Sequence, residues 1–248
     1  MIRGTSEIRD AYRNDTVAET YVDNRFREPL GAPLHDRQVG HLVRLFQQLK
    51  PQRVLEIAPG PARLTVDVAR YLPTPPVLID ASAQMLATAR RRLGAAPTSS
   101  SLVQGDAFRL PFGPVFDCVY TFRLIRHFEA EDRRRLYAEI ARVLRPGGTL
   151  VFDAINEDVS APLRRHTAAD EHQHYDALFK RDSLVAELTA AGFNVKHLEG
   201  VQRRYSLLRN LQILVAPRSR VLARSAMEIV DRVGQGSPLE WIVDCCRA

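Results

Sequence analysis

The sequence predicts an α/β fold: a doubly wound, mostly parallel seven-stranded sheet with helices on both faces and an antiparallel last strand. Short apolar runs alternate with amphipathic segments from residue 35 to about residue 200, which is the pattern of repeated β-α units. The length of 248 residues suits one large α/β domain. A composition of 45% hydrophobic and 26% charged residues is typical of a globular protein with a packed interior.

Strands and helices alternate regularly through the first two thirds of the chain. Apolar runs bounded by turn residues or acids predict five strands, at 53–57, 77–80, 102–106, 115–120 and 149–154. Apolar residues at helical spacing predict helices between them, at 39–49, 64–72, 85–93 and 136–144. Pro51 and Pro73 end the first two of these helices, because proline cannot continue a helix.

The last third of the chain continues this pattern and adds a helical segment. A helix at 184–191 ends at Gly192 and leads into a strand that begins at Phe193. A last strand is expected at 239–245. Residues 207–234 have helical periodicity, and we interpret them as a helical insertion packed on a single domain of residues 35–248.

Composition argues against several classes of partner. No run approaches the roughly 20 apolar residues of a membrane helix, and the first residues lack the apolar core of a signal peptide. We therefore expect a cytoplasmic protein with no membrane partner. The net charge of +6 is spread along the chain, which argues against nucleic acid as a partner. The three cysteines, and the group His166, His172 and His174, lack metal-ligand spacing, so no metal is expected.

A loop of small residues follows the first strand, where open α/β sheets bind nucleotide-like ligands. Its Ala58, Gly60 and Ala62 have the spacing of a Gly-x-Gly-x-Gly loop, and small side chains let a ligand approach the backbone. Pro59 and Pro61 each remove a backbone donor that a pyrophosphate would need. The loop therefore favours S-adenosyl-L-methionine, which has no phosphate, over a dinucleotide.

The second strand ends in an acid, Asp80, twenty residues after Gly60. At this position an acid can accept hydrogen bonds from both ribose hydroxyls of an adenosine. With these features the chain resembles the class I S-adenosylmethionine-dependent methyltransferases of the bacterial small-molecule type. The motifs that carry the resemblance are EIAPGPA, LIDASAQMLATAR, QGDAFRLPF, FDCVY and RVLRPGGTLVF, in the family's order and spacing. The resemblance implies S-adenosyl-L-methionine as cofactor and a small-molecule acceptor.

The resemblance also implies which residues contact the cofactor. The positions are Asp80, Ala81 and Met85 at the ribose, Asp106 and Ala107 at the adenine, Thr121 and Phe122 at the methyl-donor end, and Ala58 and Gly60 at the methionine part. Glu56 either contacts the cofactor or stabilises the loop. Residues 1–34 are similar to a helical cover over the cofactor, in which Tyr21 and Arg25 would face it and Arg25 would pair with the methionine carboxylate.

The chain departs from the family at two positions of this loop. Ala58 and Ala62 stand where the family usually has glycine, and their Cβ atoms restrict φ. This departure keeps open a non-catalytic S-adenosylmethionine-binding protein as an alternative function. A methyltransferase acting on RNA or protein is a further alternative, although no added nucleic-acid module is visible. A nicotinamide oxidoreductase is the third, and Pro59 and Pro61 argue against it.

His127 and Arg123 are the candidate catalytic residues. Both follow the fourth strand, close to where the resemblance places the transferable methyl group. At a helical spacing of four residues, Arg123 can hold an anionic acceptor while His127 removes its proton during O- or N-methylation by in-line displacement. The alternative for His127 is a purely structural packing or capping role. Residues 155–180 are expected to form a mobile cover over the acceptor pocket.

Overall fold

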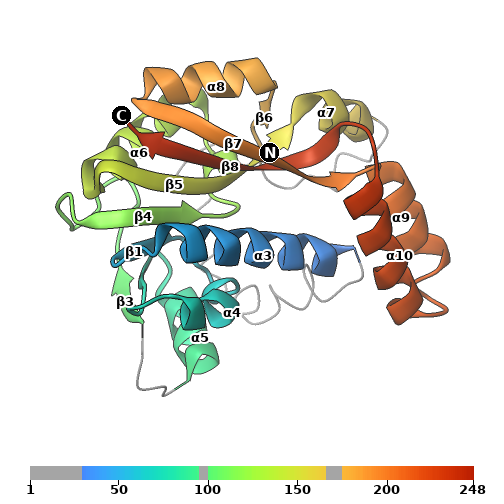
Figure 1. Ribbon diagram of the computed structural model, residues 1–248, viewed down its shortest axis with the longest axis horizontal. Helices are drawn as coiled ribbons and strands as arrows, with labels where there is room; N and C mark the ends of the chain where they lie inside the picture. Colours follow the sequence, from blue (N-terminus) through green and yellow to red (C-terminus); the bar gives the residue numbers. More distant parts are fainter. Residues whose placement is uncertain (1–29, 95–99, 166–174) are drawn as a thin grey trace.

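The computed structural model describes residues 30–94, 100–165 and 175–248, and these residues build one mixed sheet (Figure 1). Seven strands follow the spatial order β3-β2-β1-β4-β5-β8-β7. Their bounds are β1 (Val54–Ile57), β2 (Val77–Asp80), β3 (Ser101–Gln104), β4 (Phe116–Thr121), β5 (Leu144–Asn156), β7 (Phe193–Arg203) and β8 (Pro238–Arg247). β8 lies antiparallel between β5 and β7, while the pairs among β1 to β5 are parallel. The expected fold class, including the antiparallel last strand, is confirmed.

Helices cover both faces of the sheet (Figure 1). On one face lie α6 (Ala130–Val143) and α8 (Arg181–Ala190), and on the other lie α3 (Gly31–Leu49) and α4 (Thr65–Val68). Successive strand residues separate into two cores, because side chains alternate across a sheet. The core under α6 and α8 includes Leu55, Val119 and Phe152, and the core under α3 includes Val54, Cys118 and Val151.

Several boundaries differ from the sequence-based expectation. The helix expected at 64–72 is instead the single turn α4 followed by a 3₁₀ turn, η1 (Ala69–Tyr71). β5 begins at Leu144, five residues early, because Leu144 pairs with Phe116 before an irregularity in the β4–β5 register. A two-residue strand, β6 (Leu178–Phe179), adds an unexpected eighth strand beside β5. So short a strand has no periodicity that a sequence pattern can detect.

The segments around the sheet complete the domain. α5 (Ala83–Leu93) follows β2, η2 (Ile125–His127) follows β4, and α7 (Glu157–Arg165) follows β5. α7 and β6 lie within the polar segment 155–180, whose residues 166–174, with their histidines, fall outside the described residues. α3 begins at Gly31 and so runs across the expected boundary between 1–34 and 35–248, and residues 1–29 are also outside the described residues.

Two further helices form a hairpin between β7 and β8. α9 (Tyr205–Leu214) and α10 (Arg220–Val233) project from one end of the molecule (Figure 1) and occupy the segment interpreted as a helical insertion. The two helices pack on each other through Leu208, Ala223 and Met227. No helix in the described ranges is long and apolar enough to cross a membrane.

A buried histidine ties α3 to the antiparallel end of the sheet. His41 on α3, only 5% exposed, contacts Glu199 of β7 through Nδ1 at 2.6 Å and Asp244 of β8 through Nε2 at 2.7 Å. Burial alone disfavours the charged ring, but the hydrogen bonds to Asp244 and Glu199 outweigh it and raise the pKa of His41 to about 9. Arg37 and Arg44 also contact Glu199, so this is a charged cross-link among three elements.

Candidate active site

A cavity of about 290 Å³ opens at the carboxyl ends of β1, β2 and β4. Loops at this edge of an open α/β sheet are the usual ligand-binding segments. Eleven of the residues expected from the sequence line the cavity: Glu56, Ala58, Gly60, Asp80, Ala81, Met85, Asp106, Ala107, Phe122, Arg123 and His127. Segments as far apart in the sequence as Glu56 and His127 therefore meet around one space.

The loop after β1 has the backbone conformation that glycine favours. Ala58, Gly60 and Ala62 all have positive φ, at 53°, 55° and 55°. The Ala58 amide donates to the Ile79 carbonyl at 2.8 Å, which holds the loop against the end of β2. The two alanines thus occupy positions that strain a residue with a Cβ atom. Ala62 differs from Ala58 in that its methyl group is fully buried.

Asp80 ties two loops of the cavity together. One of its carboxylate oxygens accepts from the Gly60 amide at 3.0 Å, and the other accepts from the Ser82 amide at 2.8 Å. Burial raises the pKa of Asp80, and the backbone donors from Ser82 and Gly60 offset part of that effect. The Ser82 hydroxyl in turn accepts from the Met85 amide at 3.2 Å and caps α5. The end of β2 is therefore rigidly joined to the loop after β1.

Glu56 is a buried carboxyl group at the end of β1. It accepts hydrogen bonds from the Thr65 hydroxyl and, at 3.0 Å, from the Tyr120 hydroxyl. Burial raises its pKa to about 7, against the opposing effect of these hydrogen bonds. The group is consequently poised to ionise near neutral pH when a cation approaches.

Two expected contact residues also have clear structural roles. Asp106 accepts from the Phe108 amide at 2.9 Å and so stabilises the turn after β3. Thr121 is fully buried, donates to the Ile57 carbonyl at 2.8 Å and is not among the residues that line the cavity. Tyr21 and Arg25 lie outside the described residues.

Comparison with known proteins identifies the family. The family described as "Methyltransferase domain" matches residues 54–148. A malonyl-[acyl-carrier protein] O-methyltransferase from Methylococcus capsulatus is 33% identical over 182 residues, covering 71% of this chain and 65% of the relative. Residues 54–148 therefore form a methyltransferase domain, and the chain is similar to class I S-adenosylmethionine-dependent methyltransferases.

Other relatives agree with this assignment. A demethylmenaquinone methyltransferase from Deinococcus radiodurans is 37% identical over 104 residues, covering 41% of this chain and 42% of the relative. The chain thus spans between about two fifths and two thirds of the length of these curated relatives. The fold is shared with magnesium protoporphyrin IX methyltransferase from Synechocystis PCC 6803, solved with bound SAH, at 12% identity and a TM-score of 0.64 over 89% of this chain and 86% of that one.

The cavity fits the cofactor of this methyltransferase family. S-adenosyl-L-methionine has a cationic sulfonium and amine, and the buried Glu56 offers a carboxyl group of raised pKa beside the strained loop after β1. Asp80 ends β2 at the position of a ribose-binding acid. In the part of the chain that the structure describes, no cluster of histidine, cysteine and acidic residues is arranged to hold a metal ion.

Arg123 and His127 lie on the cavity wall, but not as neighbours on one helical turn. Arg123 has a left-handed φ of 63° in a bend, and only Ile125–His127 form the 3₁₀ turn η2. The expected i, i+4 helical pairing is therefore wrong. Arg123 is held instead by its backbone amide, which donates to Asp153 of β5. A bend brings both side chains to the cavity where a regular helix was expected.

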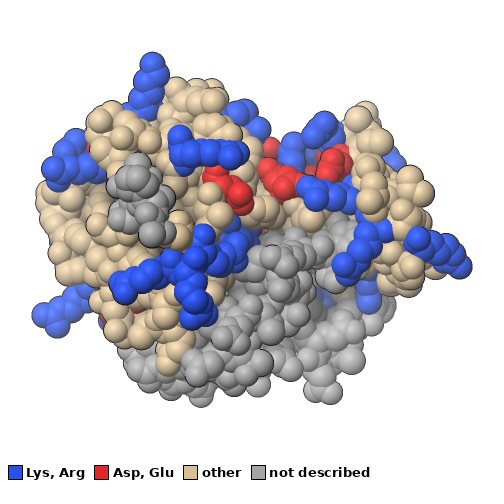
Figure 2. Space-filling model, turned by 90° about the horizontal axis from the view of Figure 1, so that it is seen from below, with Lys and Arg blue, Asp and Glu red and all other residues tan. Residues whose placement is uncertain are grey.

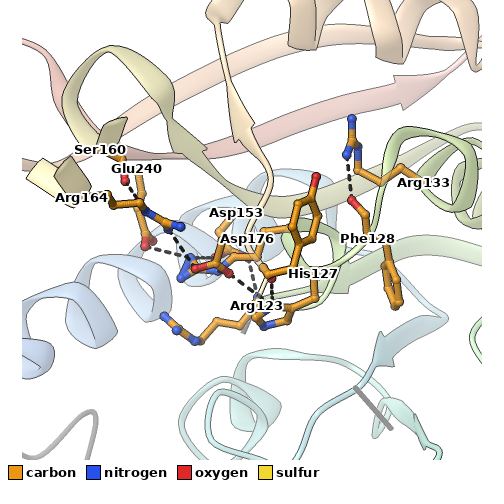
Figure 3. A network of polar contacts seen from close by, with 11 residues as sticks. Arg123, His127, Phe128, Arg133, Asp153, Ser160, Arg164, Asp176 and Glu240 are labelled. Atoms are coloured by element: carbon orange, nitrogen blue, oxygen red, sulfur yellow. Dashed lines mark hydrogen bonds and ion pairs between the residues drawn. The ribbon is translucent and has the colours of Figure 1, made fainter. Parts of the chain in front are cut away.

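His127 is held by residues 175 and 176, and Figure 3 shows Asp176 beside it. Its Nδ1 lies 3.0 Å from the Tyr175 carbonyl oxygen and 3.2 Å from a carboxylate oxygen of Asp176. The Ala177 amide donates to the Arg126 carbonyl at 2.6 Å, so the described end of the segment 155–180 packs directly on η2. Asp176 was not anticipated from the sequence.

A buried charge network surrounds this contact (Figure 3). Arg126 contacts Asp153 at 2.9 Å and Glu240 at 2.8 Å, and Arg164 contacts Asp176 at 2.9 Å. Burial opposes ionisation of Asp176, but the hydrogen bond from His127 and the charges of Arg126 and Arg164 hold its pKa well below the usual range. Burial raises the pKa of Glu240. The network joins η2, β5, α7 and β8 behind His127.

Sequence reasoning also missed part of the lining. Phe108 and Phe128 meet edge to face, with ring centroids 5.0 Å apart, and Arg63 reaches the cavity from the loop after β1. Phe108 lies inside the quoted motif QGDAFRLPF, and Arg63 directly follows EIAPGPA. Their place beside motif residues was a usable signal, and Phe128 directly follows the candidate residue His127.

Proposed function

We propose that this chain transfers the methyl group of S-adenosyl-L-methionine to a small-molecule acceptor. The cofactor supplies a methyl group already activated by its sulfonium, so the protein needs to align the reactants and exclude water. Family membership supports the reaction, and the names of the relatives, among them a demethylmenaquinone methyltransferase, support a small acceptor. O- or N-methylation by in-line displacement is the corresponding chemistry.

In this proposal the carboxyl edge of the sheet binds the cofactor. Asp80 accepts hydrogen bonds from the ribose hydroxyls, with Ala81 and Met85 beside it. Glu56 faces the methionine part, which Ala58 and Gly60 also approach. The remaining contacts proposed from the family resemblance are Asp106 and Ala107 at the adenine, Phe122 near the methyl group with the buried Thr121 supporting it, and Tyr21 and Arg25 from the cover.

Removal of the Asp80 carboxylate tests the cofactor site. We expect Asp80→Ala to weaken binding by about 1 to 3 kcal/mol, because ribose hydroxyls lose their acceptors in a desolvated site. Isothermal titration with S-adenosyl-L-methionine measures the effect, and Asp132→Ala on the surface of α6 serves as the control. An affinity within twofold of the parent protein would remove Asp80 from the site.

His127 is the proposed general base, and the contact of its Nδ1 with the Tyr175 carbonyl carries this role. A carbonyl oxygen only accepts hydrogen bonds, so Nδ1 carries the ring proton and Nε2 of the neutral ring carries the lone pair. Asp176 stabilises the imidazolium that forms when the acceptor loses its proton. Arg123 supplies a positive charge on the same cavity wall for an anionic acceptor.

A methyl-transfer assay with labelled cofactor tests this role. A panel of small hydroxy acids, phenols and amines is offered to the parent protein and to two variants. We expect His127→Ala to lower kcat about 100-fold or more on an ionisable hydroxyl acceptor without changing cofactor affinity, and we expect higher pH to restore part of the rate. The matched control is His197→Ala, which removes an exposed histidine of β7.

The outcomes separate the alternatives. An unchanged kcat for His127→Ala would return this residue to a structural role. Cofactor binding without transfer to any acceptor of the panel would favour the non-catalytic alternative, for which the left-handed Ala58 and Ala62 are the specific observation. Absence of cofactor binding at millimolar concentration would contradict the proposed function.

A further inference from the structure

The α9–α10 hairpin carries most of the exposed large apolar side chains of the described residues. These are Leu207, Ile213, Leu214, Val221, Leu222, Ile229 and Val233, and their exposed fractions run from 41% to 75%. Across the rest of the described chain, Leu49, Val66 and Tyr71 are the others of this kind, at 38% to 46%. Such a concentration on one short segment marks a surface for interaction.

The spacing of these side chains on α10 forms a continuous face. Leu222, Ile229 and Val233 recur at intervals of seven and four residues, which places them on one side of the helix. Ala223 and Met227 are buried on the other side, where α10 packs on α9. The exposed face is therefore not needed for the fold of the hairpin.

The hairpin has a net positive charge, and one of its arginines, Arg224, is paired with Asp36 and Glu228. Five arginines lie on its two helices and their connection: Arg209, Arg218, Arg220, Arg224 and Arg232. The acidic residues there are Glu228 and the buried Asp231. Figure 2 shows basic side chains projecting around a largely uncharged surface at the end of the molecule that carries this hairpin.

The hairpin also lies on the same side of the sheet as the cavity, where the parallel strands have their carboxyl ends. β7 is antiparallel to β8, which is antiparallel to β5, so β7 runs in the direction of β5, β4 and β1. Its carboxyl end at Arg203, from which the hairpin departs, is therefore on the cavity side. The hairpin is fixed there because the Arg203 amide donates to Asp231 at 2.7 Å and the Leu30 amide donates to Gln212 at 3.0 Å.

We propose that the α9–α10 hairpin docks this protein on a membrane surface that contains anionic lipid. An aliphatic face flanked by arginines inserts shallowly among headgroups while the guanidinium groups meet lipid phosphates. Surface docking needs no spanning helix, so the lack of a long apolar run, on which the expectation of no membrane partner was based, does not oppose it. The proposal is independent of the acceptor and of the catalytic residues.

Two other occupants fit the hairpin less well. A second copy of the chain, paired by a two-fold axis, would bring the same arginines against one another. A protein partner is favoured by exposed tryptophan or tyrosine anchors, whereas leucine and valine contribute few binding hot spots. The exposed set here is entirely aliphatic.

Co-sedimentation of the full chain with lipid vesicles tests the proposal. Vesicles of phosphatidylcholine with about a quarter phosphatidylglycerol are compared with pure phosphatidylcholine at about 0.1 M salt. We expect binding to the anionic vesicles to be about tenfold tighter or more, and to weaken as salt is added. Equal binding to both vesicles, or no binding to either, would overturn the proposal.

Variants separate the apolar and charged contributions. Leu222→Gln with Ile229→Gln, and separately Arg209→Gln with Arg232→Gln, should each weaken vesicle binding about tenfold. All four side chains are exposed, so the variants should keep the parent Tm. Leu49→Gln, an exposed apolar residue on α3, is the matched control and should bind like the parent.

The same variants distinguish a lipid surface from the other possible partners of the hairpin. If the parent dimerises without lipid and Leu222→Gln with Ile229→Gln abolishes the dimer, the face pairs two copies, and the lipid proposal is wrong. If soluble polyglutamate displaces the protein from vesicles and the apolar variant binds like the parent, the arginines bind acidic polymers in general, and the proposal is again wrong.

Discussion

Ala58 and Ala62 have the same strained backbone conformation but differ in how much their methyl groups contribute to stability by burial. Both have a left-handed φ near 55°, a conformation that costs a residue with a Cβ atom about 1 kcal/mol relative to glycine. Only Ala62 offsets this cost by burying its methyl group completely, against Leu78 and Ala89. A buried methyl contributes about 0.8 kcal/mol. The loop therefore keeps an alanine at 62 for packing, a reason that applies less to Ala58, which is only half-buried.

The two glycine substitutions should consequently differ. We expect Ala58→Gly to raise the free energy of unfolding by about 0.5 to 1 kcal/mol, because strain is relieved and little packing is lost. Ala62→Gly should change it by less than about 0.5 kcal/mol, because relief of strain and loss of packing nearly cancel. Urea unfolding midpoints at constant slope measure both. A larger gain at 62 than at 58 would show that backbone strain is not the deciding term.

At the scale of elements, the cross-link through His41 makes the attachment of α3 to β7 and β8 depend on pH. The folded-state pKa of about 9 lies above the ordinary value of about 6.5, so protonation favours the folded state. The stabilisation is complete below about pH 6.5 and is lost as the pH rises through about 9. Two and a half pH units correspond to about 3 kcal/mol.

We therefore expect the free energy of unfolding to fall by about 3 kcal/mol between pH 6.5 and pH 9.5, and His41→Asn to remove most of this dependence. Chemical unfolding at a series of pH values measures it. His197→Asn, which changes the exposed ring stacked 6.4 Å from His41, is the control and should keep the parent slope. A parent protein with constant stability over this range would contradict a charged His41.

At the scale of the whole molecule, the strands and the cofactor loops were predictable from the sequence, while the surroundings of His127 were not. The central strands β1, β2 and β4 are short, mostly apolar and largely buried runs, and the motif residue Asp80 stands directly at the end of β2. Arg126, Asp153 and Glu240 meet only through packing across more than a hundred residues of sequence. Local sequence patterns do not predict contacts between residues so far apart in the sequence. The bend at Arg123 escaped for a related reason, because Asp153 of β5 stabilises it.

The position of β8 has a consequence for synthesis of the chain. β8 fills the gap between β5 and β7, yet the ribosome makes both of those strands before it. A nascent chain that has emerged as far as α10 therefore exposes two strand edges with unpaired amide and carbonyl groups, which can pair with a neighbouring nascent chain. A chaperone that binds open strand edges would therefore protect the chain until β8 has emerged and paired with both neighbours.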